Sequence, residues 1–326
     1  MSDPTPPLTS TPDYYPPVQV WVVHPPKQRY WLHALLLLAT FSTTLVVGAH
    51  MEDNFLHNLP VLGSPVPGSD DDAVSFFPAI WALEQPSRLL LGLPFSCALM
   101  LILLAHEMGH YLYCKHYGVY ATLPFFIPAP TLIGTLGAFI RIRSPIRSRR
   151  ALFDVGASGP FVGFALALPA LVYGVLHAKV VPALATDGNA DLVFGVPLLL
   201  KLMAVLFRPH VDAAQLLLHP VGRAAWVGIF ATALNLLPVG QLDGGHIVRS
   251  MSARAHRAVS LALPALLCFL GIISSHIWLL WAAILLGLRF FRLAPIYDPT
   301  PLDSRRKFGT AMALIVFLLC FMPKPL

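Results

Sequence analysis

Charged side chains are scarce in this sequence: Asp, Glu, Lys and Arg make up only 12% of 326 residues, while 56% are hydrophobic and the mean hydropathy is +0.68. A soluble domain of this size usually carries about 25% charged residues. The composition therefore excludes a soluble globular domain and predicts a protein embedded in a lipid bilayer. The formal net charge of +6 does not indicate a nucleic-acid partner, because the basic residues gather in alternate loops, a pattern that reflects membrane topology.

Motifs that would suggest other functions are missing. The four cysteines occur singly, so no CxxC pair is present for a structural zinc site or a redox motif. Neither a GxSxG motif nor paired buried carboxylates occur, which argues against an esterase or a glycosidase. Residues 1–28 are rich in proline and lack the apolar core of a signal peptide, so we expect a disordered tail there. We expect residues 29–326 to form a single membrane domain with its core at 89–250.

Long apolar runs predict an all-α polytopic membrane protein with six or seven transmembrane helices. The count stays open because several runs are shorter than the ~20 residues that cross a bilayer, and the fifth and sixth could form one hairpin. With the N-terminus inside, alternation of spans places the arginine-rich loops in the cytoplasm and the acidic first loop outside, in agreement with the positive-inside rule. The expected spans are Trp31–Val47, Leu89–Tyr113, Leu152–Leu176, Ala224–Val239, Val259–Ile273, Ile277–Leu288 and Thr310–Phe321.

Two segments depart from this helical pattern. Ala121–Ser144 contains three prolines and two glycines and ends in a β-branched and aromatic run, which predicts a small membrane-associated β-element or re-entrant hairpin. At membrane depth such an element must be covered by protein or paired with another chain. Phe194–Phe207 is apolar but contains Pro197 and Lys201, so we expect an interfacial or re-entrant segment rather than a span.

The strongest chemical signal is the run His106-Glu107-Met108-Gly109-His110. Residues four apart on a helix share a face, so both imidazoles can bind one metal ion while Glu107 acts as a base toward the attacking water. The motif ends an apolar span, where ionisable side chains are costly and functional by default. Glu107 is also the only one of three glutamates outside the acidic first loop. Packed histidines with a Glu partner, or a proton relay in a transporter, are the alternatives.

A catalytic zinc site needs a third protein ligand and leaves one position open. No glutamate follows Glu107, which removes one common source of that ligand. His116 has the six-residue spacing of another class, but Tyr113 stands where that class has a helix-breaking glycine, and a continuing helix turns His116 away. Asp243, on a Gly-rich turn at the same cytoplasmic depth as His110, could complete the site, with helix capping as its alternative role. His246 is a reserve ligand.

Four segments carry a resemblance to a known family: the HExxH run at His106–His110, the run Asn235-x-x-Pro238 with the later Asp243-Gly244, the segment GTLGAFIR at Gly134–Arg141, and Gly156-Ala-Ser-Gly159-Pro160. Together they resemble the site-2 proteases, the intramembrane zinc metalloproteases of the M50 type, from about residue 95 to 250. The resemblance implies that His106, His110 and Asp243 hold one Zn²⁺ ion. It also implies that Glu107 is the general base and acid and that Asn235 helps to position the substrate. The PDZ or CBS domains of some family members are missing.

The expected function is therefore an intramembrane zinc metalloendopeptidase that cuts single-span membrane proteins within or near their transmembrane segments. Such a substrate must unwind locally, and its freed backbone groups need partners in lipid. Strand addition to an edge at Gly134–Arg141 would supply them, since Gly137, Ala138 and Phe139 leave room for a second backbone; a purely structural hairpin is the alternative. Asn235 could also bond to the extended substrate or act as an interhelical amide.

The main rival function is a membrane transporter or channel that uses the His/Glu cluster to move metal ions or protons. For either function the bilayer is a partner and nucleic acid is not. The family resemblance and the absence of an organelle transit segment indicate a prokaryotic plasma (inner) membrane, with the active site towards the cytoplasm. The sequence does not indicate the oligomeric state.

Overall fold

The computed structural model describes residues 28–59, 78–181, 195–288, 296–298 and 300–323, and these are mostly helical. The expected N-terminal tail falls on residues 1–27, outside the described part. Four helical stretches are long and apolar enough to cross a bilayer: Tyr30–His57, Pro86–His116, Arg149–Leu176 and Ala253–Ile273. The expectation of a helical membrane protein is therefore confirmed, whereas the count of six or seven spans is not.

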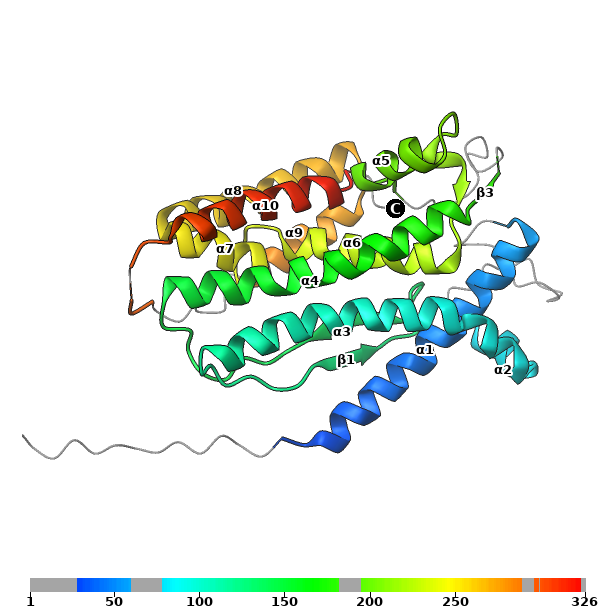
Figure 1. Cartoon of the computed structure of the whole chain (residues 1–326), viewed down its shortest axis with the longest axis horizontal. Helices are drawn as coiled ribbons and strands as arrows, with labels where there is room; N and C mark the ends of the chain where they lie inside the picture. The colour runs from blue at the N-terminus through cyan, green and yellow to red at the C-terminus, as the bar shows by residue number, and fades with distance from the viewer. Residues whose placement is uncertain (1–27, 60–77, 182–194, 289–295, 299, 324–326) are drawn as a thin grey trace, which may run out of the picture.

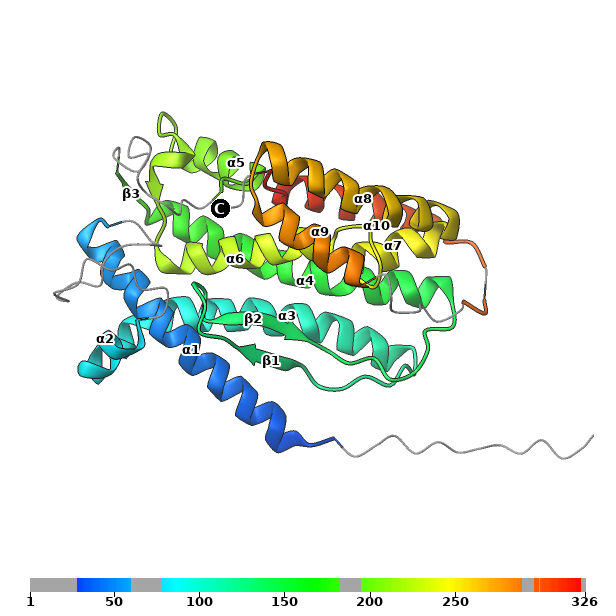
Figure 2. The ribbon, with the colours of Figure 1, turned by 180° about the vertical axis from the view of Figure 1, so that it is seen from behind.

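In chain order the elements are α1 (Tyr30–His57), α2 (Ala79–Glu84), η1 (Pro86–Gly92), α3 (Leu93–His116), β1 (Phe125–Pro128), β2 (Thr135–Phe139), α4 (Arg149–Leu176), β3 (Lys179–Val180), α5 (Leu198–Phe207), η3 (Ala213–Gln215), β4 (Leu216–Leu217), α6 (Pro220–Asn235), α7 (Asp243–Met251), α8 (Ala253–Ile273), α9 (Ile277–Leu288) and α10 (Ser304–Cys320). Helix α4 packs against α3, α6 and α7 and is the centre of the arrangement. Figure 1 and Figure 2 show α1 crossing obliquely on one side of α3, and α8 to α10 on the opposite side of α4.

Helix α4 begins where Ser148 caps it: the Ser148 hydroxyl accepts a hydrogen bond from the Ala151 backbone N–H. Pro160 and Pro169 lie inside the helix, which is tolerated in a transmembrane segment because neighbouring helices and local adjustments satisfy the freed backbone groups. Leu171 of α4 is fully buried in the main apolar core. The helix is therefore a fixed support on which α3 and α7 both pack.

The expected β-element is confirmed as a hairpin. Strands β1 and β2 pair antiparallel, with Phe125 opposite Phe139 and Phe126 opposite Ala138. The turn between them is held against α1, because the Thr43 hydroxyl donates a 2.6 Å hydrogen bond to the carbonyl of Gly134. The sheet contains only β1 and β2, so the second edge of β2 is paired with no other strand in the described part of the chain. Figure 2 shows β2 lying along α3.

The helix that leads to the Asn235–Asp243 segment differs from its predicted bounds. Ala224–Val239 was the expected span, but α6 runs from Pro220 to Asn235, and the residues after it form turns up to Leu242. The helix begins early because Pro220 fits its first turn, where a backbone N–H is not needed. The shift places Asn235 on the last turn of α6. Helix α5, within the predicted interfacial segment, has only 10 residues and is too short to span a bilayer.

A polar cluster joins the end of α3, the start of α4 and the start of α10. Arg306 on α10 donates from Nε to Asp154 Oδ1 at 2.9 Å and from a terminal nitrogen to Asp154 Oδ2 at 2.6 Å. The same guanidinium lies 3.2 Å from the hydroxyl of Tyr117, which donates to Asp154. Burial and the hydrogen bond to Asp154 raise the pKa of the Tyr117 phenol. The cluster ties the C-terminal helix to the helix that carries the HExxH motif.

Replacing Arg306 with alanine is expected to destabilise the folded protein by about 1–3 kcal/mol. The partly buried Asp154 carboxylate then loses both of its hydrogen bonds from the Arg306 guanidinium. Thermal unfolding of the purified protein in detergent measures this loss. Arg305→Ala is the matched control, since Arg305 is the exposed neighbour on the same helix. Equal unfolding temperatures for the Arg306 and Arg305 variants would show that the cluster contributes nothing.

Candidate metal centre

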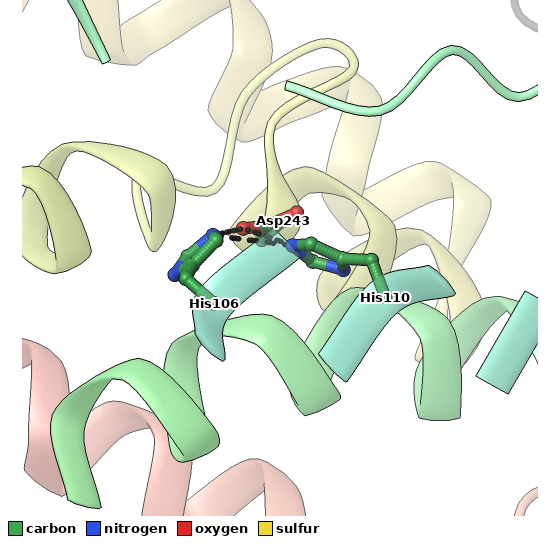
Figure 3. Close-up of side chains that lie close together, drawn as sticks. All are labelled: His106, His110 and Asp243. Carbon is green, nitrogen blue, oxygen red and sulfur yellow. Dashed lines mark hydrogen bonds and ion pairs between the residues drawn. The ribbon is translucent and has the colours of Figure 1, made fainter. Parts of the chain in front are cut away.

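His106, His110 and Asp243 bring three ligand atoms together (Figure 3). The two Nε2 atoms on α3 are 3.2 Å apart, and each lies 3.3 Å from Oδ2 of Asp243, the first residue of α7. All three side chains are largely shielded from solvent. Two helix ends far apart in sequence thus place two imidazoles and one carboxylate around a common point.

The spacing of these atoms fits a zinc ion. Ligands about 2.0–2.1 Å from a tetrahedral ion are about 3.3 Å apart. The three pairs of ligand atoms are 3.2–3.3 Å apart. The donor set of two imidazole nitrogens and one carboxylate oxygen is also one that catalytic zinc sites use, with the fourth position open. In the described part of the chain this is the only group of three or more such side chains within ligand distance.

The ring of His110 is oriented by a further contact on α4. Its Nδ1 lies 2.7 Å from the carbonyl oxygen of Val155, so Nδ1–H donates there and Nε2 keeps its lone pair for a metal ion. A histidine ligand of zinc almost always has such a partner for its second nitrogen. Asn235, on the last turn of α6, lies with Nδ2 3.1 Å from Nε2 of His106 and borders the same space. The site therefore has contributions from α3, α4, α6 and α7.

Asp243 reaches the histidines because α7 begins directly at this residue, not on a turn as the sequence suggested. The first turn of α7 packs tightly onto the end of α6: a Cβ added to Gly244 would lie 2.0 Å from the carbonyl oxygen of Leu236. Only glycine permits this approach. Burial opposes ionisation of Asp243, but the imidazoles of His110 and His106 outweigh it and hold the pKa of this carboxyl well below its usual range. The ionised carboxylate is the form of Asp243 that would bind a metal ion.

Two glycines of α4 pack directly against the imidazole rings of His106 and His110. A Cβ added to Gly159 would lie 2.1 Å from Nε2 of His110, and one added to Gly163 would lie 3.1 Å from the ring of His106. Gly156 faces α7 in the same way, at 2.7 Å from Cβ of His246. The sequence motif around Gly156 and Gly159 carried the family resemblance, but its contact with the metal centre was not predicted. Small residues at intervals of three and four were the only sequence signal.

Glu107 lies on α3 between the two histidines and is buried. Its carboxylate accepts a hydrogen bond from the backbone of Ile140, the residue that follows β2. The predicted substrate-binding residues Gly137, Ala138 and Phe139 lie on β2, immediately before this contact. Space beside Gly137 is open, since a Cβ added there would meet nothing within 4 Å. The structure thus brings the hairpin to the residue expected to act as the base.

Two other histidines considered from the sequence do not join the group. His116 ends α3 and lies beside the rings of Tyr113 and Tyr117, with centroids 6.4 and 5.0 Å away. His246 follows Asp243 by one helical turn, but it is not among the three residues whose ligand atoms meet. Asp243 is therefore the third residue of the group in the described part of the chain, and its role as a ligand stays a prediction.

Comparisons with known proteins identify the family. The sequence model of peptidase family M50 matches residues 94–278. The chain is 30% identical over 307 residues to "Probable zinc metalloprotease EGY1, chloroplastic" of Arabidopsis thaliana. This alignment covers 90% of this chain and 53% of the relative. It is 28% identical to EGY2 of the same plant, over 83% of this chain and 46% of the relative. EGY1 of Oryza sativa subsp. japonica is 32% identical over 68% of this chain and 38% of that protein.

The chain thus spans about half the length, or less, of these curated relatives. All three are named as probable zinc metalloproteases, which agrees with the donor set found at His106, His110 and Asp243. Their names give a chloroplast location, so the expectation of a prokaryotic plasma membrane is not confirmed. The family match covers more than half of the residues and includes all four residues of the expected zinc site. The chain belongs to peptidase family M50.

Proposed function

We propose that this protein is an intramembrane zinc metalloendopeptidase that hydrolyses peptide bonds within or near the transmembrane segments of membrane proteins. The observation that carries the proposal is the meeting of His106, His110 and Asp243 at zinc-ligand separations, next to Glu107, in a member of family M50. We assign His106, His110 and Asp243 as the ligands of one Zn²⁺ ion. The rival function of a transporter finds no support in the family match or in the names of the relatives.

Glu107 is the residue that we assign to proton transfer. When bound, zinc supplies Lewis acidity, which polarises a carbonyl and makes water more acidic. The Glu107 carboxylate takes a proton from the water that attacks the peptide carbonyl and passes it to the departing amine. Its burial excludes bulk water, and the hydrogen bond from Ile140 fixes its direction. Glu107 therefore serves first as the general base and then as the general acid.

The substrate strand is proposed to add to the second edge of β2. A transmembrane helix hides its carbonyls in its own hydrogen bonds, so the segment to be cut must become extended and find new backbone partners. The edge of β2 that is unpaired in the described chain offers such partners, and the open space at Gly137 admits a second backbone. Ala138 and Phe139 continue this edge towards Ile140 and Glu107. Asn235 is proposed to bond to the extended substrate from the opposite side.

For the wider organisation we keep the sequence-based expectation as a proposal. We propose that residues 29–326 form one membrane domain with its core at 89–250, that six or seven helices span the bilayer, and that the active site faces the cytoplasm. Single-span membrane proteins are the proposed substrates. The four helices long enough to cross a membrane support the bilayer location, and the position of the HExxH motif near the end of α3 supports a site close to one membrane surface. The prokaryotic plasma membrane stays a prediction.

Removal of zinc is expected to abolish cleavage, and its return is expected to restore it. The test uses the purified full chain in detergent, a single-span substrate, and a chelator such as 1,10-phenanthroline, with cleavage followed on gels. Restoration by zinc is expected because two contacts that do not involve the ion support the ligands: the Val155 carbonyl orients His110, and the close packing of Gly244 on Leu236 fixes the start of α7 at Asp243. Cleavage that continues at full rate in metal-free protein would contradict the proposed function.

A further inference from the structure

A cavity of about 390 Å³ lies beside the metal centre, and none of its lining residues takes part in the proposed reaction. Its wall combines the segment that follows the hairpin, one residue of α4, the turn before α7, α7 itself and a residue that precedes α10. Five of its residues are apolar and three are basic or imidazole side chains, and none is acidic. Its basic and polar members include Arg143, Gln241, His246 and Arg249.

The cavity adjoins the proposed zinc ligand Asp243 through α7. His246 follows Asp243 by one helical turn, and both pack on the same point of α4: a Cβ added to Gly156 would lie 2.7 Å from Cβ of His246 and 3.1 Å from the backbone oxygen of Asp243. Arg249 lies a further turn along α7 and also lines the cavity. A group that occupies the cavity is therefore next to the metal centre and separate from its ligands.

The opposite wall continues the strand along which the substrate is proposed to lie. After β2 the chain stays extended, because Ile142 bridges Ala121 antiparallel and the Arg143 N–H donates to the carbonyl of Tyr120 at 2.8 Å. A substrate strand on the edge of β2 passes Glu107 at Ile140 and then reaches the cavity wall at 142–146. The first residues of this wall, Ile142 and Arg143, lie two and three residues beyond Ile140, which is about 7–10 Å along an extended strand.

The cavity is suited to an anion. Arg143 reaches it from the exposed rim, and Arg249 is partly buried, with a pKa that burial lowers. A partly buried guanidinium is less hydrated than an exposed guanidinium, so its electrostatic attraction to a carboxylate is stronger. His246 adds a buried Nδ1 atom that has no hydrogen-bond partner among the described residues. No carboxylate lines the cavity.

We propose that this cavity is a specificity subsite for an acidic side chain of the substrate, an Asp or Glu about two to four residues from the cleaved bond on its cytoplasmic side. The inference rests on the proposed protease function and adds a sequence preference to it. Transmembrane segments usually carry Lys or Arg at their cytoplasmic flank. A subsite lined by Arg143 and Arg249 rejects these flanks by like-charge repulsion, so it selects the minority of membrane proteins with an acidic flank.

The test compares single-span substrates that differ only by Glu, Gln or Lys at one position, scanned across the residues beyond the cleaved bond. Cleavage is measured as kcat/KM for the full zinc-loaded chain in phosphatidylcholine vesicles. We expect the Glu substrate to be cut about tenfold faster than the Gln substrate, as for one charge-assisted hydrogen bond, and the Lys substrate to be cut slowest. Arg249→Gln should bring the Glu to Gln ratio close to one, and Arg249→Glu should favour Lys.

Two controls make the outcome specific. Arg254→Gln removes the same charge from the exposed start of α8, outside the cavity, and should leave the ratio unchanged. Arg143→Gln, on the exposed rim, should lower the ratio even where a variant at Arg249 fails to fold. Adding phosphatidylglycerol tests an anionic lipid headgroup as the occupant: if the rate follows the lipid and not the substrate residue, the inference is overturned.

The two proposals fail differently. If Glu, Gln and Lys substrates are all cut equally, in a reaction that needs zinc and is lost in Glu107→Gln, the subsite is wrong and the protease stands. If no substrate of the series is cut in a zinc-dependent way, both are overturned. A preference for Glu that Arg249→Gln removes and Arg254→Gln retains supports the subsite.

Discussion

Glu107→Gln is expected to lower the rate of peptide cleavage by about 10²–10⁴-fold while zinc stays bound, because a positioned proton-transfer group contributes a factor of this size. The amide has nearly the shape of the carboxylate but cannot accept the proton of the attacking water. The three proposed zinc ligands are other residues, whose ligand atoms lie within 4.8 Å of one another. Single-turnover cleavage of a single-span substrate, with metal analysis of the same preparation, measures both quantities.

Asp243→Asn is the matched comparison for this variant. It also replaces a carboxylate with an amide, but at the third proposed zinc ligand, whose Oδ2 lies 3.3 Å from Nε2 of each histidine. We expect this variant to lose zinc as well as cleavage, because a neutral amide is a poorer ligand than a carboxylate. The contrast separates proton transfer from metal binding. Retained cleavage in Glu107→Gln would remove Glu107 from the role of base.

The parts of the site that the sequence predicted are local in the chain. The HExxH spacing fixes two imidazoles on one face of a helix whatever surrounds it, so the prediction for His106 and His110 depends only on α3 being helical. The hairpin was predictable for a similar reason, since prolines, glycines and β-branched residues in Ala121–Ser144 exclude a continuous helix. These features need no knowledge of packing.

What the sequence left open depends on contacts between distant segments. The start of α7 at Asp243 follows from the packing of Gly244 on Leu236, which periodicity does not reveal. The pairing of Arg306 with Asp154 joins residues 152 positions apart, and no spacing rule connects them. The number of spans is open for another reason. Runs shorter than about 20 apolar residues cross a bilayer or lie at its surface according to their neighbours, not their composition.

Gly159→Ala is expected to disable the metal centre, although residue 159 carries no chemical group. The added methyl would lie 2.1 Å from Nε2, 2.5 Å from Cδ2 and 2.5 Å from Cε1 of His110, so the imidazole must move away. Its Nδ1 is held at 2.7 Å by the carbonyl of Val155 on the same helix, which restricts where it can go. A displacement of about 1 Å at a catalytic group can cost about 100-fold in rate. We therefore expect at least this loss of cleavage, together with a reduced zinc content.

Gly287→Ala provides the control for the backbone effect of the substitution. Gly287 also lies in a helix, α9, but a Cβ there would meet nothing within 4 Å. Alanine is favoured over glycine in a helix by about 1 kcal/mol, so this variant should be as stable as the parent or more stable, with full zinc content. If Gly159→Ala matches Gly287→Ala in both zinc content and cleavage, α4 does not support His110. A selective loss in Gly159→Ala would instead identify the glycine face of α4 as the surface that fixes the ligand geometry.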